Sequence, residues 1–280
     1  MLNSAQKRVH KYLRTNKNFP HVWCAGCSIG ITLGTIIRAV DDIGFKNDEM
    51  VMVSGIGCSS RMPVYVDFNT LHTLHGRGIA FATGIKMFKP KLKVMVVTGD
   101  GDATAIGGNH FIHAARRNLD ITVILINNNI YGMTGGQYSP TTPKGDNATT
   151  AQHGNIDPDF DICKLAIGAG ATYVARSTAY HAIEAQKMIK EALLHPGFSL
   201  VEIISACPTY FGKMNKKGTG PEMMRDMKDN SITIKALERL PKDKADPTGK
   251  IIRGVFVQDT KAEYTASYQK MVDKLSKKEK

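Results

Sequence analysis

Short apolar runs alternate with amphipathic stretches along most of this chain. The apolar runs predict buried β-strands at residues 50–53, 93–98, 121–126, 172–175 and 199–205. Between them, apolar positions at helical spacing predict helices at residues 28–40, 75–88, 109–117, 159–169, 179–194 and 262–278. Ser28 stands where the first helix needs an N-cap. Residues 134–157 are polar without periodicity, and a loop of that length is usually functional or disordered.

This alternation predicts an α/β fold with a mostly parallel sheet and helices on both faces. In such sheets, ligands bind beyond the carboxyl ends of the strands. Four of the predicted strands end just before unusual residues, namely residues 55–58 after the first, Asp100, Asn128 and Cys207. Because parallel strands place these loops on one edge, we expect the four to converge there.

Length and charge limit the domain organisation and the possible partners of the protein. The 280 residues allow one large domain or a domain with an appendage, and we expect an α/β domain at 1–212 and a basic extension at 213–280. That extension holds 17 Lys and Arg against 10 Asp and Glu, a net charge of +7 out of +12. A basic surface attracts nucleic acid, anionic substrates or acidic proteins. No nucleic-acid-binding signature accompanies it, so a docking surface and a solvated lysine-rich face are the two interpretations that stay open.

No apolar run approaches the ~20 residues of a membrane helix. We therefore expect a cytoplasmic protein that binds neither membrane nor nucleic acid. The five cysteines are an odd number without a secretory signal, which argues against a disulfide framework.

A pair of acidic and amide residues carries the strongest chemical signal. Asp100, in the run Gly-Asp-Gly-Asp, is followed 28 residues later by Asn128, the middle of three asparagines. A hard divalent cation such as Mg²⁺ takes oxygen ligands and shares them with substrate phosphates. Alone, Gly-Asp-Gly is an ordinary turn. With the asparagines at this distance, it resembles the thiamine diphosphate motif, in which Gly-Asp-Gly is followed at a set distance by Asn-Asn.

Four cysteines form a second candidate set. A Cys-x-x-Cys pair alone serves zinc sites, redox disulfides and iron–sulfur clusters alike. Two further cysteines complete a possible tetrathiolate, and the last is followed by proline, as in many cluster motifs. The set comprises Cys24, Cys27, Cys58 and Cys207. Zinc is the simplest occupant, but a [4Fe–4S] cluster could accept electrons from a neighbouring thiamine cofactor. Cys163 lies among apolar helix residues, and we expect it to be a buried hydrophobe.

The order of motifs resembles the β subunits of the 2-oxoacid:ferredoxin oxidoreductases, over residues 20 to about 220. The shared segments are WCAGC at 23–27, GIGCS at 55–59, LHTLHGRG at 71–78, GDGD at 99–102, IGGNH at 106–110, RRN at 116–118, NNIYGMTGGQ at 128–137, SPTT at 139–142 and CPT at 207–209. The resemblance implies the thiamine-diphosphate-binding fold. It also implies oxidative decarboxylation of a 2-oxo acid to an acyl-CoA and CO₂, with electrons passing through the cluster to ferredoxin.

The resemblance also implies residue roles. Mg²⁺ would be bound by the side chains of Asp100 and Asn128 and by the backbone carbonyl of Ile130. The cluster would be held by the four cysteines named above. Thiamine diphosphate would be lined by Ile56, Gly57, Cys58, Ser59, His75, Gly101, Asp102, Gly132 and Met133. Asn129 adds a third asparagine, which leaves open which one binds the cation. His75 has an alternative role as a hydrogen-bonded core histidine.

Within that family, CPTYFG at 207–212 followed by NKK at 215–217 is most similar to the enzymes of 2-oxoglutarate. Pyruvate or a branched-chain 2-oxo acid is the alternative substrate. We find no Glu suited to activate thiamine, and the resemblance implies that an α subunit supplies it. Two other functions stay open: a non-oxidative thiamine decarboxylase or synthase, and a zinc-stabilised scaffold. The residues 134–142 favour a lid over the site rather than a plain connector.

Overall fold

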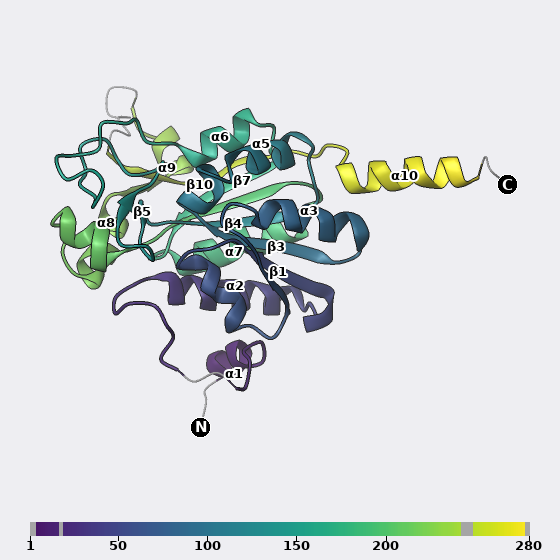
Figure 1. Ribbon diagram of the computed structural model, residues 1–280, viewed down its shortest axis with the longest axis horizontal. Helices are drawn as coiled ribbons and strands as arrows, with labels where there is room; N and C mark the ends of the chain where they lie inside the picture. The colour runs from purple at the N-terminus through teal and green to yellow at the C-terminus, as the bar shows by residue number, and fades with distance from the viewer. Residues whose placement is uncertain (1–3, 17–18, 242–248, 278–280) are drawn as a thin grey trace.

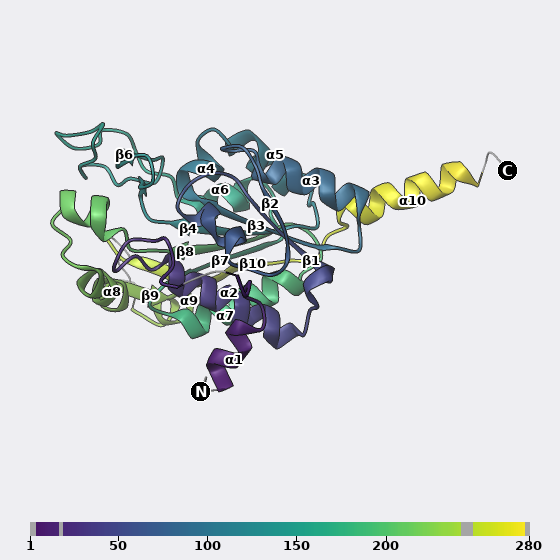
Figure 2. The ribbon, with the colours of Figure 1, turned by 60° about the horizontal axis from the view of Figure 1, so that its bottom comes forward.

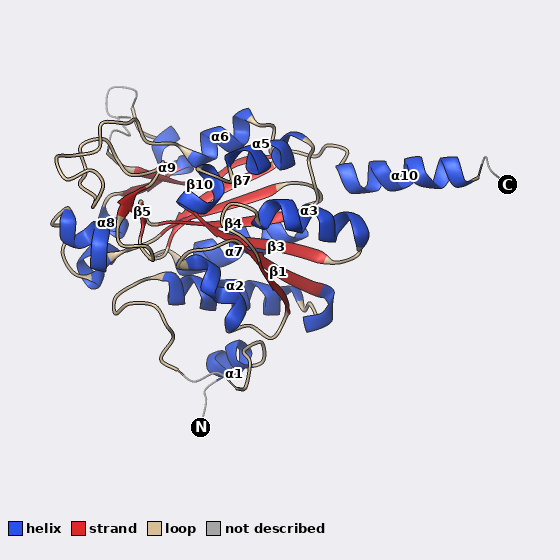
Figure 3. Cartoon of the chain, in the orientation of Figure 1, coloured by secondary structure: helices blue, strands red, loops and turns tan. Residues whose placement is uncertain are grey.

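The computed structural model describes residues 4–16, 19–241 and 249–277. One eight-stranded sheet forms its centre, in the order β2-β1-β3-β4-β8-β7-β10-β9 (Figures 1 and 3). Its strands are β1 (Met50–Ser54), β2 (Asn69–His72), β3 (Lys93–Gly99), β4 (Thr122–Asn127), β7 (Tyr173–Thr178), β8 (Ser199–Ile204), β9 (Ser231–Thr233) and β10 (Ile251–Gln258). β5 (Ile130–Tyr131) and β6 (Gln137–Tyr138) form a separate small hairpin. All pairings in the large sheet are parallel except that of β10 with β7.

Helices cover both faces of the sheet, as the alternating pattern predicted (Figures 1 and 2). The helices are α1 (Ser4–His10), α2 (Ile29–Ile43), α3 (Gly78–Phe88), α4 (Asp100–Thr104), α5 (Gly108–Arg116), α6 (Ile162–Gly168), α7 (Ala182–Leu194), α8 (Gly220–Asp229), α9 (Ile234–Glu238) and α10 (Tyr264–Ser276). Two cores result. One packs α2 and α7 against one face, and the other packs α3, α5 and α6 against the opposite face. The central strands are buried on both sides, which explains their continuous apolar runs.

The predicted convergence of loops is confirmed. β1, β3, β4 and β8 are successive neighbours and all run parallel. Their carboxyl ends therefore bring Cys58, Asp100, Asn128 and Cys207 to one edge of the sheet.

Two local predictions need correction. Ser28 is the N-cap residue of α2, as predicted, but its side chain makes no capping bond. Its Oγ instead lies 2.8 Å from Oγ of Ser205 and accepts the backbone N–H of Ala206 at 2.8 Å, which ties the segment beside Cys27 to the one beside Cys207. The helix expected from residue 75 begins only at Gly78. Gly76 has a φ of +69°, a left-handed conformation that no α-helix accommodates.

The basic part of the chain is more regular than its sequence indicated. β9 and β10 continue the main sheet, and α8 packs Met223 and Met227 into the core beside α2 and α7. A domain boundary at residue 212 stays a prediction.

α10 extends away from the body of the protein in both views (Figures 1 and 2). Residue 278, the predicted end of that helix, lies outside the described residues. No helix in the described ranges is both long and apolar enough to cross a bilayer.

Candidate functional site

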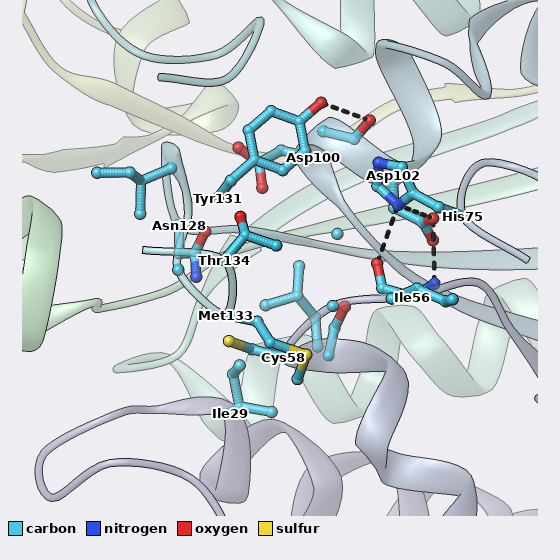
Figure 4. Close-up of a pocket in the computed structure, with 17 residues that line it drawn as sticks. Ile29, Ile56, Cys58, His75, Asp100, Asp102, Asn128, Tyr131, Met133 and Thr134 are labelled. Carbon is cyan, nitrogen blue, oxygen red and sulfur yellow. Dashed lines mark hydrogen bonds and ion pairs between the residues drawn. The ribbon is translucent and has the colours of Figure 1, made fainter. Parts of the chain in front are cut away.

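A cavity of about 310 Å³ opens at the carboxyl edge of β1, β3 and β4 (Figure 4). Every residue that the sequence suggested for thiamine diphosphate or for Mg²⁺ lines it. These are Ile56, Gly57, Cys58, Ser59, His75, Asp100, Gly101, Asp102, Asn128, Ile130, Gly132 and Met133. The lining also includes residues that the sequence did not single out, namely Ile29, Gly99, Ile126, Tyr131 and Thr134. Their actual roles toward a ligand remain predictions.

Asp100 is a buried carboxylate without a cationic partner. It follows β3 directly, at the start of α4, and is 3% exposed. Its Oδ2 accepts hydrogen bonds from Ser139 Oγ at 2.5 Å and Thr141 Oγ1 at 2.7 Å. Burial raises the pKa of this carboxyl, and the two hydroxyl donors oppose that rise only in part. None of the described Lys, Arg or His side chains forms an ion pair with it. A buried charge of this kind fits a bound cation.

The structure distinguishes the three asparagines. Asn128 lines the cavity beside Asp100. The amide of Asn127 donates to Glu202 Oε1 at 2.8 Å, and its carbonyl lies 3.0 Å from Thr141 Oγ1, whose single proton it shares with Asp100. Asn129 is left-handed, with φ +60°, and its N–H donates to Oδ1 of Asn127 at 3.1 Å. Asn128 is therefore the asparagine best placed for the cation.

Asp102 ties two loops of the cavity wall together. Its Oδ1 accepts the backbone N–H of Gly76 at 2.7 Å and that of Ile56 at 3.2 Å. Its Oδ2 accepts Thr98 Oγ1 at 2.7 Å. His75 Nδ1 lies 3.0 Å from the same carboxylate and 3.2 Å from the carbonyl of Ile56 (Figure 4). Both oxygens of Asp102 are thus engaged by protein groups, so this carboxylate shapes the wall of the site.

Tyr131 is a site residue that the sequence reasoning missed, although it lies inside the segment 128–137. Its hydroxyl donates to the carbonyl of Gly101 at 3.2 Å (Figure 4). A Cβ on Gly101 would lie 2.3 Å from the Tyr131 ring, so only glycine fits there. Burial, followed by the nearby Asp100 and Asp102 charges, raises the pKa of Tyr131 to about 12. The phenol therefore stays protonated at neutral pH.

The four candidate cysteines gather beside this cavity. A Cβ on Gly132 would lie 3.4 Å from Sγ of Cys58 and 3.7 Å from Sγ of Cys207. Burial and then the charges of Cys207, Cys58 and Cys24 raise the pKa of Cys27 to about 12. Cys58 and Cys207 therefore both lie next to Gly132, and the pKa of Cys27 responds to the other three thiols. They are not a preformed site, however: within the described ranges, no three His, Cys, Asp or Glu side chains already stand in a metal-binding arrangement.

Two further contacts concern the cysteines. Trp23 Nε1 donates to the carbonyl of Cys58 at 2.7 Å, which fixes the Cys24 segment against the loop after β1. Cys163 is 1% exposed, in the core on the α6 side of the sheet, and its thiol donates to Glu202 Oε2 at 3.3 Å. The prediction that Cys163 is a buried hydrophobe is confirmed for its burial, with one polar contact added.

Comparison with known proteins gives consistent matches. Residues 55–203 match the family model of the thiamine pyrophosphate enzyme C-terminal TPP binding domain. The 2-oxoglutarate synthase subunit KorB of Methanocaldococcus jannaschii is 48% identical over 265 residues, covering 95% of this chain and 97% of that protein. KorB of Archaeoglobus fulgidus is 49% identical over 260 residues, covering 93% and 92%. A solved 2-oxoglutarate:ferredoxin oxidoreductase from Magnetococcus marinus, with 2-oxoglutarate, coenzyme A and succinyl-CoA bound, superposes with a TM-score of 0.85. It shares 34% identity, over 96% of this chain and 91% of that one.

Proposed function

Since the chain belongs to the β subunits of the 2-oxoacid:ferredoxin oxidoreductases, we propose that it serves the oxidative decarboxylation of 2-oxoglutarate to succinyl-CoA and CO₂, with electrons delivered to ferredoxin. The choice of 2-oxoglutarate is supported by two relatives named for that substrate, each covering nearly the whole chain. It is also supported by the similar solved enzyme, which holds 2-oxoglutarate and both coenzyme A species.

The cavity would hold thiamine diphosphate with Mg²⁺. The observation that carries this proposal is the buried, cation-free carboxylate of Asp100 beside Asn128. With the carbonyl of Ile130, these residues offer the oxygen donors that Mg²⁺ prefers, and diphosphate oxygens would complete its shell. Bound thiamine diphosphate supplies the nucleophilic carbon and electron sink that decarboxylation of a 2-oxo acid requires.

The chain's own residues would orient this cofactor and shield it from water. The loop Ile56–Ser59 and the segment of Gly132 and Met133 both line the cavity and meet near Cys58. Asp102 holds the first of these segments in place by accepting the backbone N–H of Ile56. Tyr131, protonated and anchored on Gly101, offers no charge to compete with the cation.

Cys24, Cys27, Cys58 and Cys207 would hold a [4Fe–4S] cluster. Four thiols are the ligand set such a cluster needs, and the position of Cys58 and Cys207 next to Gly132 supports the assignment. Cys58 belongs both to this group and to the cavity lining, so the cluster would adjoin the cofactor. Zinc at the same thiols is the alternative, and it would leave the protein colourless.

Two protein partners complete the proposal. The acidic residues of the cavity lining are Asp100 and Asp102, and no Glu belongs to it. The carboxylate that activates the aminopyrimidine would thus come from an α subunit. Ferredoxin would dock near the cluster, drawn by the net charge of +12. We also propose a cytoplasmic location, because reducing compartments keep thiols free and all five cysteines are unpaired.

The experiment is anaerobic co-purification with the α subunit, followed by electron transfer to ferredoxin in the presence of coenzyme A. We expect a brown protein with broad absorbance near ~400 nm and turnover with 2-oxoglutarate in preference to pyruvate or branched-chain acids. A Cys163→Ser complex is the matched control and should behave as wild type. Decarboxylation that needs no electron acceptor would instead establish a non-oxidative enzyme. A colourless protein would exclude the cluster, and metal analysis would then show whether zinc occupies the thiols.

A further inference from the structure

A buried carboxylate on β8 lies behind the candidate site without belonging to its lining. Glu202 is 1% exposed. Its Oε2 accepts Arg176 Nε at 2.6 Å and the Cys163 thiol at 3.3 Å. Arg176 also donates to Asp161 at 2.6 Å, so its charge has a second carboxylate as partner. The other oxygen of Glu202, Oε1, accepts Nδ2 of Asn127 on the neighbouring strand β4 at 2.8 Å.

Glu202 sets the orientation of the Asn127 side-chain amide. An ionised carboxylate only accepts hydrogen bonds, so it faces the NH₂ end of a neighbouring amide. The carbonyl end of Asn127 must then point the other way. There it accepts the backbone N–H of Asn129 at 3.1 Å, and it shares the single proton of Thr141 Oγ1, 3.0 Å away, with Asp100.

Both contacts of that carbonyl lead to the candidate cation ligands. The bond from Asn129 N–H closes a turn around Asn128 and holds Asn129 at φ +60°. The Thr141 hydroxyl, which lies against Asn127, is 2.7 Å from Oδ2 of Asp100. One amide group therefore braces Asn128 through the backbone and Asp100 through a hydroxyl.

We propose that Glu202 is a positioning residue for the cation site: through Asn127 it holds Asp100 and Asn128 in the arrangement that binds Mg²⁺ with thiamine diphosphate. This inference rests on the proposed function and adds to it a residue that touches neither ligand. Asp161 also pairs with Arg176, so charge balance for Arg176 does not by itself explain the presence of Glu202. Residues behind metal ligands typically contribute 10–100-fold to metal affinity.

An exchange of polarity tests the proposal. In Glu202→Gln, the Arg176 guanidinium should hold the carbonyl oxygen of the new Gln side chain. The NH₂ group of that Gln then faces Asn127, so the Asn127 amide must turn round to offer it a carbonyl oxygen. After this reversal, the NH₂ group of Asn127 faces the backbone N–H of Asn129. Two donors cannot form a hydrogen bond, so the turn around Asn128 opens. Adding Asn127→Asp restores an acceptor on both sides, because carboxylate and amide have changed places. Asn127→Asp alone sets two carboxylates against each other.

The readout is the dissociation constant of Mn²⁺, an oxygen-preferring substitute for Mg²⁺, measured by electron paramagnetic resonance on the assembled complex with saturating thiamine diphosphate. We expect Glu202→Gln to bind Mn²⁺ at least about tenfold more weakly and Asn127→Asp more weakly still. The double variant should return to within about threefold of wild type. Cys163→Ala, which removes a contact of Glu202 away from Asn127, should bind as wild type.

Equal affinity in Glu202→Gln and wild type, or a double variant no better than the single ones, overturns the inference. Should Glu202→Gln fail to fold, Thr141→Val gives a second test that can refute the proposal. This variant cuts the path from Asn127 to Asp100 and leaves the pair with Arg176 intact, so unchanged Mn²⁺ affinity would refute the chain of contacts. A wild-type complex that binds neither Mn²⁺ nor thiamine diphosphate would instead refute the proposed function.

Discussion

Replacing Asp100 by Asn should stabilise the cofactor-free protein and abolish its response to cofactor. Asp100 is buried, and none of the described basic side chains pairs with it. An uncompensated buried charge costs about 3–5 kcal/mol. Asn avoids that cost but weakens the hydrogen bonds from Ser139 and Thr141, by about 1–4 kcal/mol for the two. The central values leave a net gain of about 1–2 kcal/mol, or a few degrees in the melting temperature at ~2–4 °C per kcal/mol.

With thiamine diphosphate and Mg²⁺ present, the order should reverse. Ligand at about 100 times its Kd stabilises the wild type by about 2.7 kcal/mol. A variant whose affinity falls 100-fold would gain only about 0.4 kcal/mol at the same concentration. Thermal unfolding of both proteins, with and without cofactor, measures all four values. A cofactor-free variant that melts below the wild type, or one with an undiminished cofactor shift, would refute the reasoning.

Asp102→Asn is the matched control, because Asp102 is equally buried but fully hydrogen-bonded. An Asn at this position turns an NH₂ group toward a backbone N–H or a hydroxyl donor. An unsatisfied buried donor costs about 1–3 kcal/mol. The cofactor-free melting temperature should therefore fall for Asp102→Asn and rise for Asp100→Asn.

The cysteines, the partners and a buried histidine give three further predictions. Cys163→Ser should keep its iron, whereas replacing any of Cys24, Cys27, Cys58 and Cys207 by Ser should lower the iron content. Loss of iron in Cys163→Ser alone would show that the ligand set is wrong. The isolated chain should not turn over 2-oxoglutarate. In the complex, the rate of electron transfer to ferredoxin should fall as the Debye length shrinks from ~10 Å at 0.1 M salt to ~3 Å at 1 M. A rate that does not change with salt would leave the lysines as a solubility surface. Burial lowers the pKa of His195 below its usual 6.5, so the folded protein binds fewer protons, and stability should fall as pH drops below 6.5. His195→Gln should flatten this decline in denaturant unfolding between about pH 7 and pH 5, and an unchanged slope would exclude His195 as its source.

The sequence alone was sufficient to predict the central strands, the main helices between them and the edge that carries the site. Periodicity is a local property, and parallel strands must present their carboxyl ends together. The shared edge of Asp100, Asn128 and Cys58 therefore follows from the order of apolar runs and the residues that end them. The strands β9 and β10 were missed because their place in the sheet depends on pairing with the distant β7.

Only the tertiary structure decided what each polar side chain does. Asn127, Asn128 and Asn129 are identical residues in the sequence, and the structure distinguishes them by their contacts, such as the hydrogen bond from Asn127 to Glu202, 75 residues away. Likewise, Ser28 binds Ser205 rather than its own helix. A hydrogen bond depends on where both partners lie in space, and for these pairs the positions follow from the packing of the whole sheet.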